Sequence, residues 1–367
     1  MPRPVPLAGV HRRRLATQRL TAAPMRGATD VVRHLLAVQS QDAPLAAWSL
    51  AMRSRSESYA AVLAEQAGLG FVRTHVLRPT WHHVAAEDLR WLQALTGPRI
   101  ESGQAARHRA LGLDTAAKDR ALTTLGELLG GRNALTRREI QAEFAARGLP
   151  HGGEQMGHQL ATAEVRAVIC GGPPRGTEHT YLLVDEVIAH TPDDDLPTRD
   201  RPGAIRRMVH RFLSGHGPGD ERDLLRWANI PLTESRAAMA ELVEEGVLES
   251  LTVRDEAGEE FILHADPTVR PRTTREHAAY LLPTFDEVTL TYARTGFPLA
   301  RATLDRSRLI AEAGGGTVVI GGVDVGLWKR TVTGRKVSVT IHPERPLTEP
   351  ERDAVDEAIA RLTAFHE

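Results

Sequence analysis

The sequence predicts an α+β protein in which groups of helices, each followed by a pair of short strands, repeat along the chain. Two observations predict this class. Apolar residues at helical spacing give way to β-like runs three times before about residue 270. The region after about residue 270 instead contains several β-like runs separated by glycine-rich turns. With 367 residues the chain is too long for one ordinary core, so we expect several modules.

The first module is predicted over residues 1–100. Three helical stretches, two strands and a departing helix follow one another at residues 30–38, 43–54, 57–66, 69–73, 80–84 and 87–95. Arg78-Pro79 separates the two strands. Three helices followed by a two-stranded ribbon is the plan of a winged helix.

The second and third modules, residues 101–195 and 196–270, repeat this plan. The second has predicted helices at 119–129, 136–147 and 154–165 and strands at 167–170 and 180–184. The third has predicted helices at 204–213, 220–228 and 233–244 and strands at 246–253 and 261–264. Thr136 is expected to cap its helix, with Glu139 completing a capping box. The repetition is one of structure rather than of sequence.

Residues 271–367 are predicted to form a β-meander closed by a helix. The β-like runs lie at 280–288, 317–320, 323–328 and 336–341, and the helix lies at 348–365. The glycines between these runs fit turns, because no helix follows them and no lysine stands beside them as in a phosphate loop. Asp286 and Glu287 are neighbours on the first run, so we expect one carboxylate to face inward and the other outward.

Composition limits the class of protein. The 41% of hydrophobic and 25% of charged residues are typical of a soluble folded chain. A single cysteine, Cys170, excludes an internal disulfide and a cysteine-based zinc site. The N-terminus lacks the apolar stretch of a signal peptide and no apolar run is long enough for a bilayer, so we expect a cytoplasmic protein without membrane contact.

Charge is unevenly distributed along the chain. The net charge is −1, but residues 1–110 contain fifteen arginines and seven acidic residues. We expect this basic third to contact a polyanion. The residues predicted to bind are Arg12, Arg13, Arg14, Arg78, His82 and His83. An arginine bias can also reflect genome composition, and the histidines, which are neighbours on a strand, fit packing or phosphate contacts better than a metal site.

A second basic cluster surrounds a Thr-Gly turn near the C-terminus. Its members are Lys329, Arg330, Arg335 and Lys336. Such a hairpin can enter or straddle a nucleic-acid groove, although a solvated turn has the same composition. The third helix of the third module is different, because residues 233–245 carry four acidic residues and one arginine. We expect it to be scaffold, since this surface would repel phosphates.

Gln39-Ser40-Gln41-Asp42 stands between two predicted helices. Alternate residues of a turn can face the same way, so Gln39 and Gln41 can direct two amides to one spot and hold a water there. The same stretch also fits a helix start, with Asp42 as the N-cap, Pro44 in the first turn and both glutamines facing solvent. The residues alone leave both interpretations open.

Four stretches together, residues 36–42, 75–84, 281–287 and 321–328, resemble the AlkZ/YcaQ family of bacterial winged-helix DNA glycosylases. The resemblance covers nearly the whole chain. It implies a C-shaped scaffold of three tandem winged-helix modules around a DNA channel, and excision of bulky N7-alkylated or crosslinked purines. Family members use a Gln-x-Gln or Gln-x-Asp pair, which assigns the catalytic role to Gln39 and Gln41. Ser40 departs from the aliphatic residue usual at the middle position and puts the substrate range in doubt.

This chemistry needs no strong acid. A purine alkylated at N7 already carries positive charge and leaves as a neutral base, so the enzyme must place a water and shelter an oxocarbenium-like sugar. Two amides can place the water, with Ser40 and Asp42 in supporting roles. We expect a monofunctional glycosylase, monomeric and associated with the nucleoid, that binds double-stranded DNA carrying an alkylated purine and uses no metal or cofactor. The alternatives are a non-catalytic winged-helix regulator and a protein that sequesters a free alkylating toxin.

Overall fold

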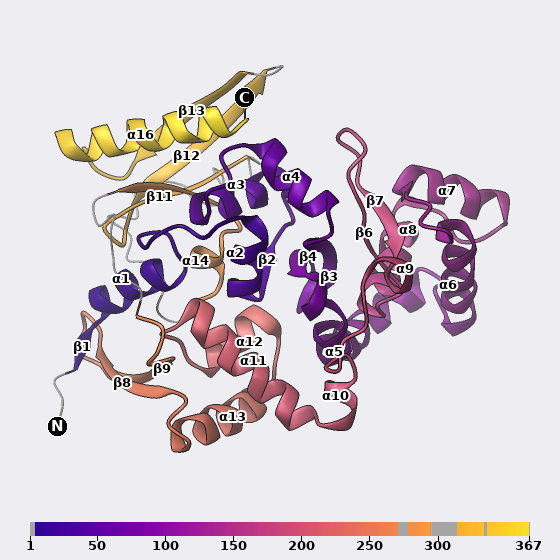
Figure 1. The fold of residues 1–367 in the computed structure, drawn as a ribbon, viewed down its shortest axis with the longest axis horizontal. Coiled ribbons are helices and arrows are strands. Elements are labelled where there is room, and N and C mark those ends of the chain that lie inside the picture. Colours follow the sequence, from indigo (N-terminus) through magenta and orange to yellow (C-terminus); the bar gives the residue numbers. More distant parts are fainter. Residues whose placement is uncertain (1–3, 271–277, 294, 296–313, 334–335, 367) are drawn as a thin grey trace. The chain divides into compact units, whose positions relative to one another are not determined.

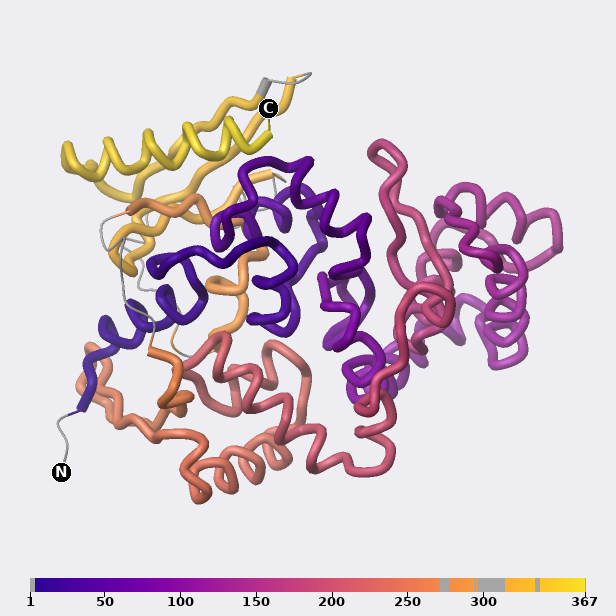
Figure 2. The backbone as a smooth tube through the Cα atoms, in the orientation of Figure 1, coloured from indigo at the N-terminus to yellow at the C-terminus, as the bar shows by residue number. Residues whose placement is uncertain are grey.

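The computed structural model describes residues 4–270, 278–293, 295, 314–333 and 336–366. Within these residues the predicted α+β class is confirmed (Figure 1). The chain packs as two compact units: unit 1 comprises Met1–Val62, Arg206–Trp227 and Pro231–Glu367, and unit 2 comprises Leu63–Ile205 and Ala228–Ile230. Both chain ends therefore belong to unit 1, drawn in indigo and yellow in Figure 2. The division into four modules stays a prediction.

Unit 1 contains helices from both ends of the sequence. They are α1 (Leu7–Thr17), α2 (Ala28–Leu35), α3 (Ala43–Arg53), α13 (Leu232–Glu244), α14 (Glu287–Leu290) and α16 (Glu349–His366). Three further helices contain a boundary between the units: α4 (Tyr59–Ala67), α11 (Arg201–His216) and α12 (Glu221–Ala228). One small sheet has the order β1 (Val5–Pro6), β8 (Glu249–Arg254) and β9 (Glu260–Ala265), with β1 parallel to β8. The short strand β2 (Ala37–Gln39) follows α2.

The predicted β-meander is confirmed as a four-stranded antiparallel sheet. Its order is β10 (Ala279–Pro283), β11 (Gly315–Ile320), β12 (Val323–Thr333) and β13 (Lys336–Pro343). Helix α16, drawn in yellow in Figure 1, packs against β10 and β13. Gly316 must be glycine at this point, because a Cβ there would lie 1.9 Å from the carbonyl oxygen of Leu282.

Two tryptophans fix strand β10 within unit 1. The indole Nε1 of Trp48, on α3, donates to the carbonyl oxygen of Leu281 at 2.9 Å. Trp328, on β12, donates to the carbonyl oxygen of Leu282 at the same distance. Both rings are buried and each indole N–H has its acceptor, which is the usual condition for burying tryptophan. Helix α3 and the meander are thereby held on the same strand.

The start of unit 1 differs from the prediction in two ways. The helix expected at 30–38 ends at Leu35, because Leu36 adopts a left-handed backbone with φ of 66° that stops a helix. Gln39 is therefore the last residue of strand β2, and the expected direct junction between two helices is wrong. Helix α1 was not predicted. Three consecutive arginines separate its buried apolar residues Val10 and Leu15 and interrupt the helical pattern.

Unit 2 contains helices α5 (Leu89–Ala110), α6 (Thr115–Leu129), α7 (Arg137–Ala146), α8 (Gly153–Val165), α9 (Val184–Val187) and α10 (Leu196–Arg199), and a 3-10 turn η1 (Ala86–Asp88). Strands β3 (Phe71–Val76) and β4 (Arg78–Ala85) form the predicted ribbon. A second small sheet has the order β5 (Leu135–Thr136), β7 (Thr180–Leu183) and β6 (Ile169–Gly171). The capping box of Thr136 and Glu139 is confirmed.

Helix α5 is longer than the predicted 87–95, because it continues through Pro98. A proline inside a helix costs about 3 kcal/mol, so tertiary packing must stabilise this turn. The neighbouring Gly97 allows that packing: a Cβ at this position would lie 2.7 Å from the carbonyl oxygen of Val165, at the end of α8. The close packing of α5 and α8 at Gly97 therefore offsets the energetic cost of Pro98, and a local sequence pattern does not predict such packing.

Along the described chain, no helix is both long and apolar enough to cross a bilayer.

Candidate functional site

The Gln-Ser-Gln-Asp stretch joins β2 to α3 in unit 1. The predicted cap is confirmed, because Asp42 Oδ1 accepts from the backbone N–H of Leu45 at 3.0 Å. Gln39 and Ser40 are buried, with 6% and 0% of their surfaces exposed, whereas Gln41 is exposed and Asp42 half-buried. The two amides thus occupy different environments, one inside the unit and one at its surface.

Gln39 is held by its backbone and offers its side-chain oxygen. Its N–H donates to Oε1 of Glu287 at 2.7 Å. Its own Oε1 is buried and accepts no hydrogen bond from any described residue. A buried carbonyl oxygen without a protein donor is costly, and such groups are the usual partners of ordered water or a ligand.

Glu287 connects the motif to two other helices, α11 and α12. Its Oε2 accepts from Trp227 Nε1, on α12, at 2.8 Å and from Thr291 Oγ1 at 3.4 Å, and His216 Nε2 lies 3.5 Å away. The Glu287 side chain is 1% exposed. Because both carboxylate oxygens are occupied, the backbone of Gln39 is fixed relative to α12 rather than only to its sequence neighbours.

Asp286 makes a second buried cluster beside Glu287. Arg53, at the end of α3, donates to both carboxylate oxygens of Asp286, at 2.7 and 2.8 Å, and Ser49 Oγ donates to Oδ2 at 2.7 Å. The guanidinium of Arg53 also donates to Gln18, and neither charged side chain is exposed. This hydrogen-bonded buried ion pair holds the C-terminal half of α3 against the start of α14.

These contacts overturn one sequence prediction. Asp286 and Glu287 were expected on a strand with one carboxylate facing outward, but β10 ends at Pro283 and both side chains are 1% exposed. The reason is that Asp286 caps the short helix α14, accepting from the N–H of Val288 at 3.0 Å, so strand alternation no longer applies. The sequence contained no signal that Arg53 and Gln39 would be the partners.

The arginine cluster on α1 is divided between interior and surface. Arg14 is fully buried; it donates to the carbonyl oxygens of Pro218 and Thr295 at 2.8 and 2.6 Å and lies 3.5 Å from the ring centre of Tyr292. Burial lowers the pKa of Arg14. A guanidinium bonded in the interior has no surface for a phosphate, so predicting Arg14 as a DNA contact is wrong. Its neighbours Arg12 and Arg13 are exposed and half-buried.

The basic hairpin brings one of its cations to the motif. Arg330 Nη2 lies 3.7 Å from Asp42 Oδ1, and its Nη1 lies 3.0 Å from Nε2 of His366. Burial lowers the pKa of Arg330 while Asp42 acts against it, and burial with the nearby Arg330 lowers the pKa of His366 to about 4. A neutral His366 is thus the acceptor for Arg330. The sequence predicted Arg330 only as a member of the basic hairpin, and its ion pair with Asp42 is seen only in the structure.

The other hairpin cations are described only in part. Lys329 is half-buried on β12, and Lys336 begins β13. Arg335, predicted with them, lies outside the described residues. The hairpin itself, β12 paired with β13, is confirmed.

Three residues predicted to bind DNA lie on the β3–β4 ribbon of unit 2, and two of them are buried. Arg78 is half-buried, but His82 and His83 are 0% and 2% exposed. The His83 ring packs edge-on against Phe71 with 5.0 Å between ring centres, and burial lowers its pKa to about 3. Because both histidines are buried, the packing alternative fits them better than direct phosphate contact.

Comparisons with known proteins agree on one family. The family model described as "DNA glycosylase AlkZ-like" matches residues 32–365. A curated relative from Streptomyces sahachiroi, named "Interstrand DNA cross-link repair glycosylase", is 26% identical over 234 residues; the match spans 60% of this chain and 60% of the relative's length. The solved structure of "Streptomyces sahachiroi DNA glycosylase AlkZ" has a TM-score of 0.74 at 20% identity, covering 99% of this chain and 97% of that one. The last likeness shows a shared fold.

Proposed function

Because the chain belongs to the AlkZ-like DNA glycosylase family, we propose that it hydrolyses the N-glycosidic bond of bulky N7-alkylated purines in double-stranded DNA. The observation that supports the proposed site most strongly is the buried Oε1 of Gln39, which accepts no hydrogen bond from any described residue. The Gln39-Ser40-Gln41 motif lies inside the segment that the family model matches.

In this proposal, Gln39 and Gln41 contact the attacking water from opposite sides. The Oε1 of Gln39 accepts a hydrogen bond from the attacking water, in a position fixed by the bond between its backbone and Glu287. The exposed Gln41 approaches the deoxyribose and orients the same water from the DNA side. An N7-alkylated purine departs as a neutral base, so the water and a preorganised polar environment are sufficient and no general acid is needed.

Asp42 supports this arrangement in two ways. It caps α3 and thereby fixes the turn that carries Gln41. Its carboxylate also adds negative potential near the sugar, where positive charge develops. Arg330 limits this effect, because the ion pair at 3.7 Å partly neutralises Asp42. Ser40, the middle residue of the motif, is buried and contributes shape rather than direct contact with DNA.

DNA binding is proposed for the predicted basic residues that are exposed or half-buried, which are Arg12, Arg13, Arg78, Lys329 and Arg330. The contacts predicted for Arg335 and Lys336 belong to the same proposal. In this proposal they contact phosphates and so fix the position of the duplex without reading its sequence. The three winged-helix modules, their C-shaped arrangement around a DNA channel, and action as a cytoplasmic monomer without a lyase step belong to the same proposal. The name of the curated relative adds crosslinked purines to the proposed substrates.

The test is release of a labelled N7-alkylguanine from a duplex. Wild type should release the base, whereas Gln41→Ala and Gln39→Ala should lose release while duplex binding is largely kept. Gln141→Ala, on α7, is a matched control that leaves the motif untouched and should retain full release. Equal release by wild type and both motif variants would refute the assignment. Binding of one preferred operator sequence without any base release would instead identify a non-catalytic regulator.

A further inference from the structure

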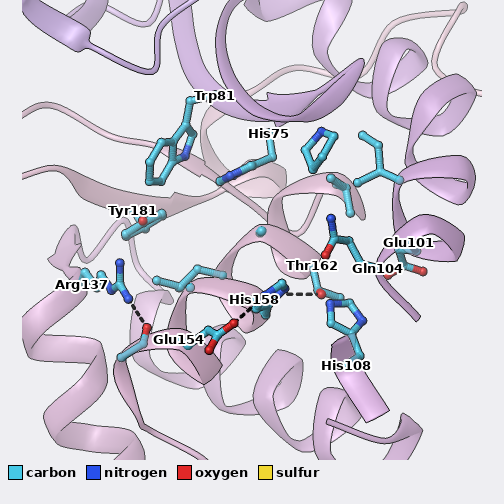
Figure 3. Close-up of a pocket in the computed structure, with 17 residues that line it drawn as sticks. His75, Trp81, Glu101, Gln104, His108, Arg137, Glu154, His158, Thr162 and Tyr181 are labelled. Atoms are coloured by element: carbon cyan, nitrogen blue, oxygen red, sulfur yellow. Dashed lines mark hydrogen bonds and ion pairs between the residues drawn. The ribbon is translucent and has the colours of Figure 1, made fainter. Parts of the chain in front are cut away.

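A second site lies in unit 2, away in sequence from the glutamine motif. A cavity of about 320 Å³ is formed by helices α5 and α8 and the ends of the β3–β4 and β6–β7 ribbons. Cavities that bind small molecules have volumes of about 300–1,000 Å³, so this one has room for a small ligand. Figure 3 shows the side chains that line it.

One side of the cavity is aromatic. His75 and Trp81 lie with 4.6 Å between their ring centres, and Tyr181 lies near them in Figure 3. Ile100 and Leu160 add aliphatic surface from the two helices. Walls of this kind favour a flat, largely apolar ring system over a flexible or strongly hydrated ligand.

Two polar side chains of α5 also line the cavity. Gln104 is half-buried and lies across the cavity from Trp81 in Figure 3. His108, one helical turn further on, is 4% exposed, and its Nδ1 is buried without a hydrogen-bond partner in the described part of the chain. Unsatisfied buried polar groups are rare in folded proteins and are costly unless a ligand or water meets them.

The carboxylates of the lining do not select a cationic ligand. Glu101 is paired with Arg166 at 2.6 Å, and Glu154 is paired with Arg107 through its Oε1 at 2.6 Å. Burial lowers the pKa of His108 to about 4, so this imidazole is neutral at pH 7. The carboxylates are therefore already compensated, and no excess of negative charge remains to select a cation.

Arg137, a cation of the lining, favours a ligand ring that carries an oxygen acceptor. Arg137, at the start of α7, lines the cavity and donates to the carbonyl oxygen of Gly153. A guanidinium has five N–H donors, so it keeps others for a ligand carbonyl. Gln104 can at the same time donate to a ring nitrogen and accept from an exocyclic amine.

From the aromatic wall, the amide of Gln104, the unsatisfied imidazole of His108 and the compensated carboxylates, we propose that this cavity binds a free neutral oxopurine, with the ring between the aromatic side and Gln104. Binding is a property of unit 2 residues alone. It does not depend on glycosylase activity, so it can be tested without DNA.

Tryptophan fluorescence gives a local readout. All five tryptophans lie in the described chain; Trp48, Trp91, Trp227 and Trp328 are at most 3% exposed, and Trp81 is half-buried at the cavity. Titration of the full chain with 7-methylguanine should quench the fluorescence in a saturable way. Trp81→Phe keeps an aromatic wall and should abolish the quenching, while calorimetry should still detect binding by this variant.

Two variants on α5 separate a specific site from a general cavity. Gln104→Leu should weaken binding of 7-methylguanine about tenfold, because it removes two hydrogen bonds at similar side-chain volume. Ser102→Ala, on the exposed side of the same helix, should bind like wild type. Quinoline, a bicyclic ring without the carbonyl and amine, should bind at least tenfold more weakly than 7-methylguanine. Absence of saturable binding, equal affinity of Gln104→Leu, or equal affinity for quinoline would each overturn the proposal.

Discussion

Glu287→Gln tests whether the buried carboxylate positions the glutamine motif. The substitution keeps the shape of the side chain but replaces one oxygen by an NH₂ group. The two oxygens now accept from Gln39 N–H at 2.7 Å and Trp227 Nε1 at 2.8 Å, so one of these donors will face another donor. A hydrogen bond to a charged group contributes about 1.5–3 kcal/mol, and we expect a loss of about 2–3 kcal/mol in the free energy of unfolding.

The effect on catalysis follows from the same geometry. If Gln39 shifts because its backbone anchor is lost, the water is misplaced, and misplacement by about 1 Å can cost on the order of 10²-fold in rate. The assay is single-turnover release of N7-alkylguanine with enzyme in excess, in parallel with denaturant unfolding. Binding to undamaged duplex should be unchanged, because Glu287 is buried.

Asp266→Asn is the matched control for Glu287→Gln. Asp266 is also a buried carboxylate of unit 1, accepting from Ser214 Oγ at 2.6 Å, but it contacts no residue of the motif. It should lower stability while the rate per folded molecule stays at the wild-type value. A wild-type rate for Glu287→Gln, or an equal loss of rate in both variants, would refute the positioning role.

Three further predictions follow from the same structure. Asp42→Ala should lower the free energy of unfolding by about 1 kcal/mol in denaturant titration, because α3 loses the cap that accepts from Leu45; an unchanged midpoint would contradict this. Asp286→Ala should cost about 3–5 kcal/mol, because it leaves the guanidinium of Arg53 buried without its carboxylate, and the double variant with Arg53→Met should recover part of that loss. Since His83 has a pKa of about 3 when folded and 6.5 when unfolded, its contribution to stability is present above pH 6.5 and is lost as the pH falls. At pH 5 the loss should be about 2 kcal/mol, and His83→Leu should reduce the pH dependence of unfolding between pH 7 and 5.

Local patterns predicted the order of most elements. The capping box at Thr136 and the cap at Asp42 depend only on residues three apart, so the sequence was sufficient to place them. The β-meander was also predicted. Its strands β11, β12 and β13 follow one another closely in sequence, whereas α14 stands between β10 and β11. Missed elements, such as α1 and the second half of α5, are those whose stability comes from packing rather than propensity.

The sequence by itself determined which residues stand in the motif and which family the chain resembles. It did not determine their environments. Two contacts decide these environments: the hydrogen bond between Gln39 and Glu287, and the ion pair between Arg53 and Asp286. Each joins residues more than 230 positions apart. No local propensity encodes such a contact, because its energy depends on desolvation and on hydrogen-bond geometry that exist only when distant segments are packed together. The tertiary structure therefore decided that one glutamine is a fixed interior acceptor and the other lies at the surface.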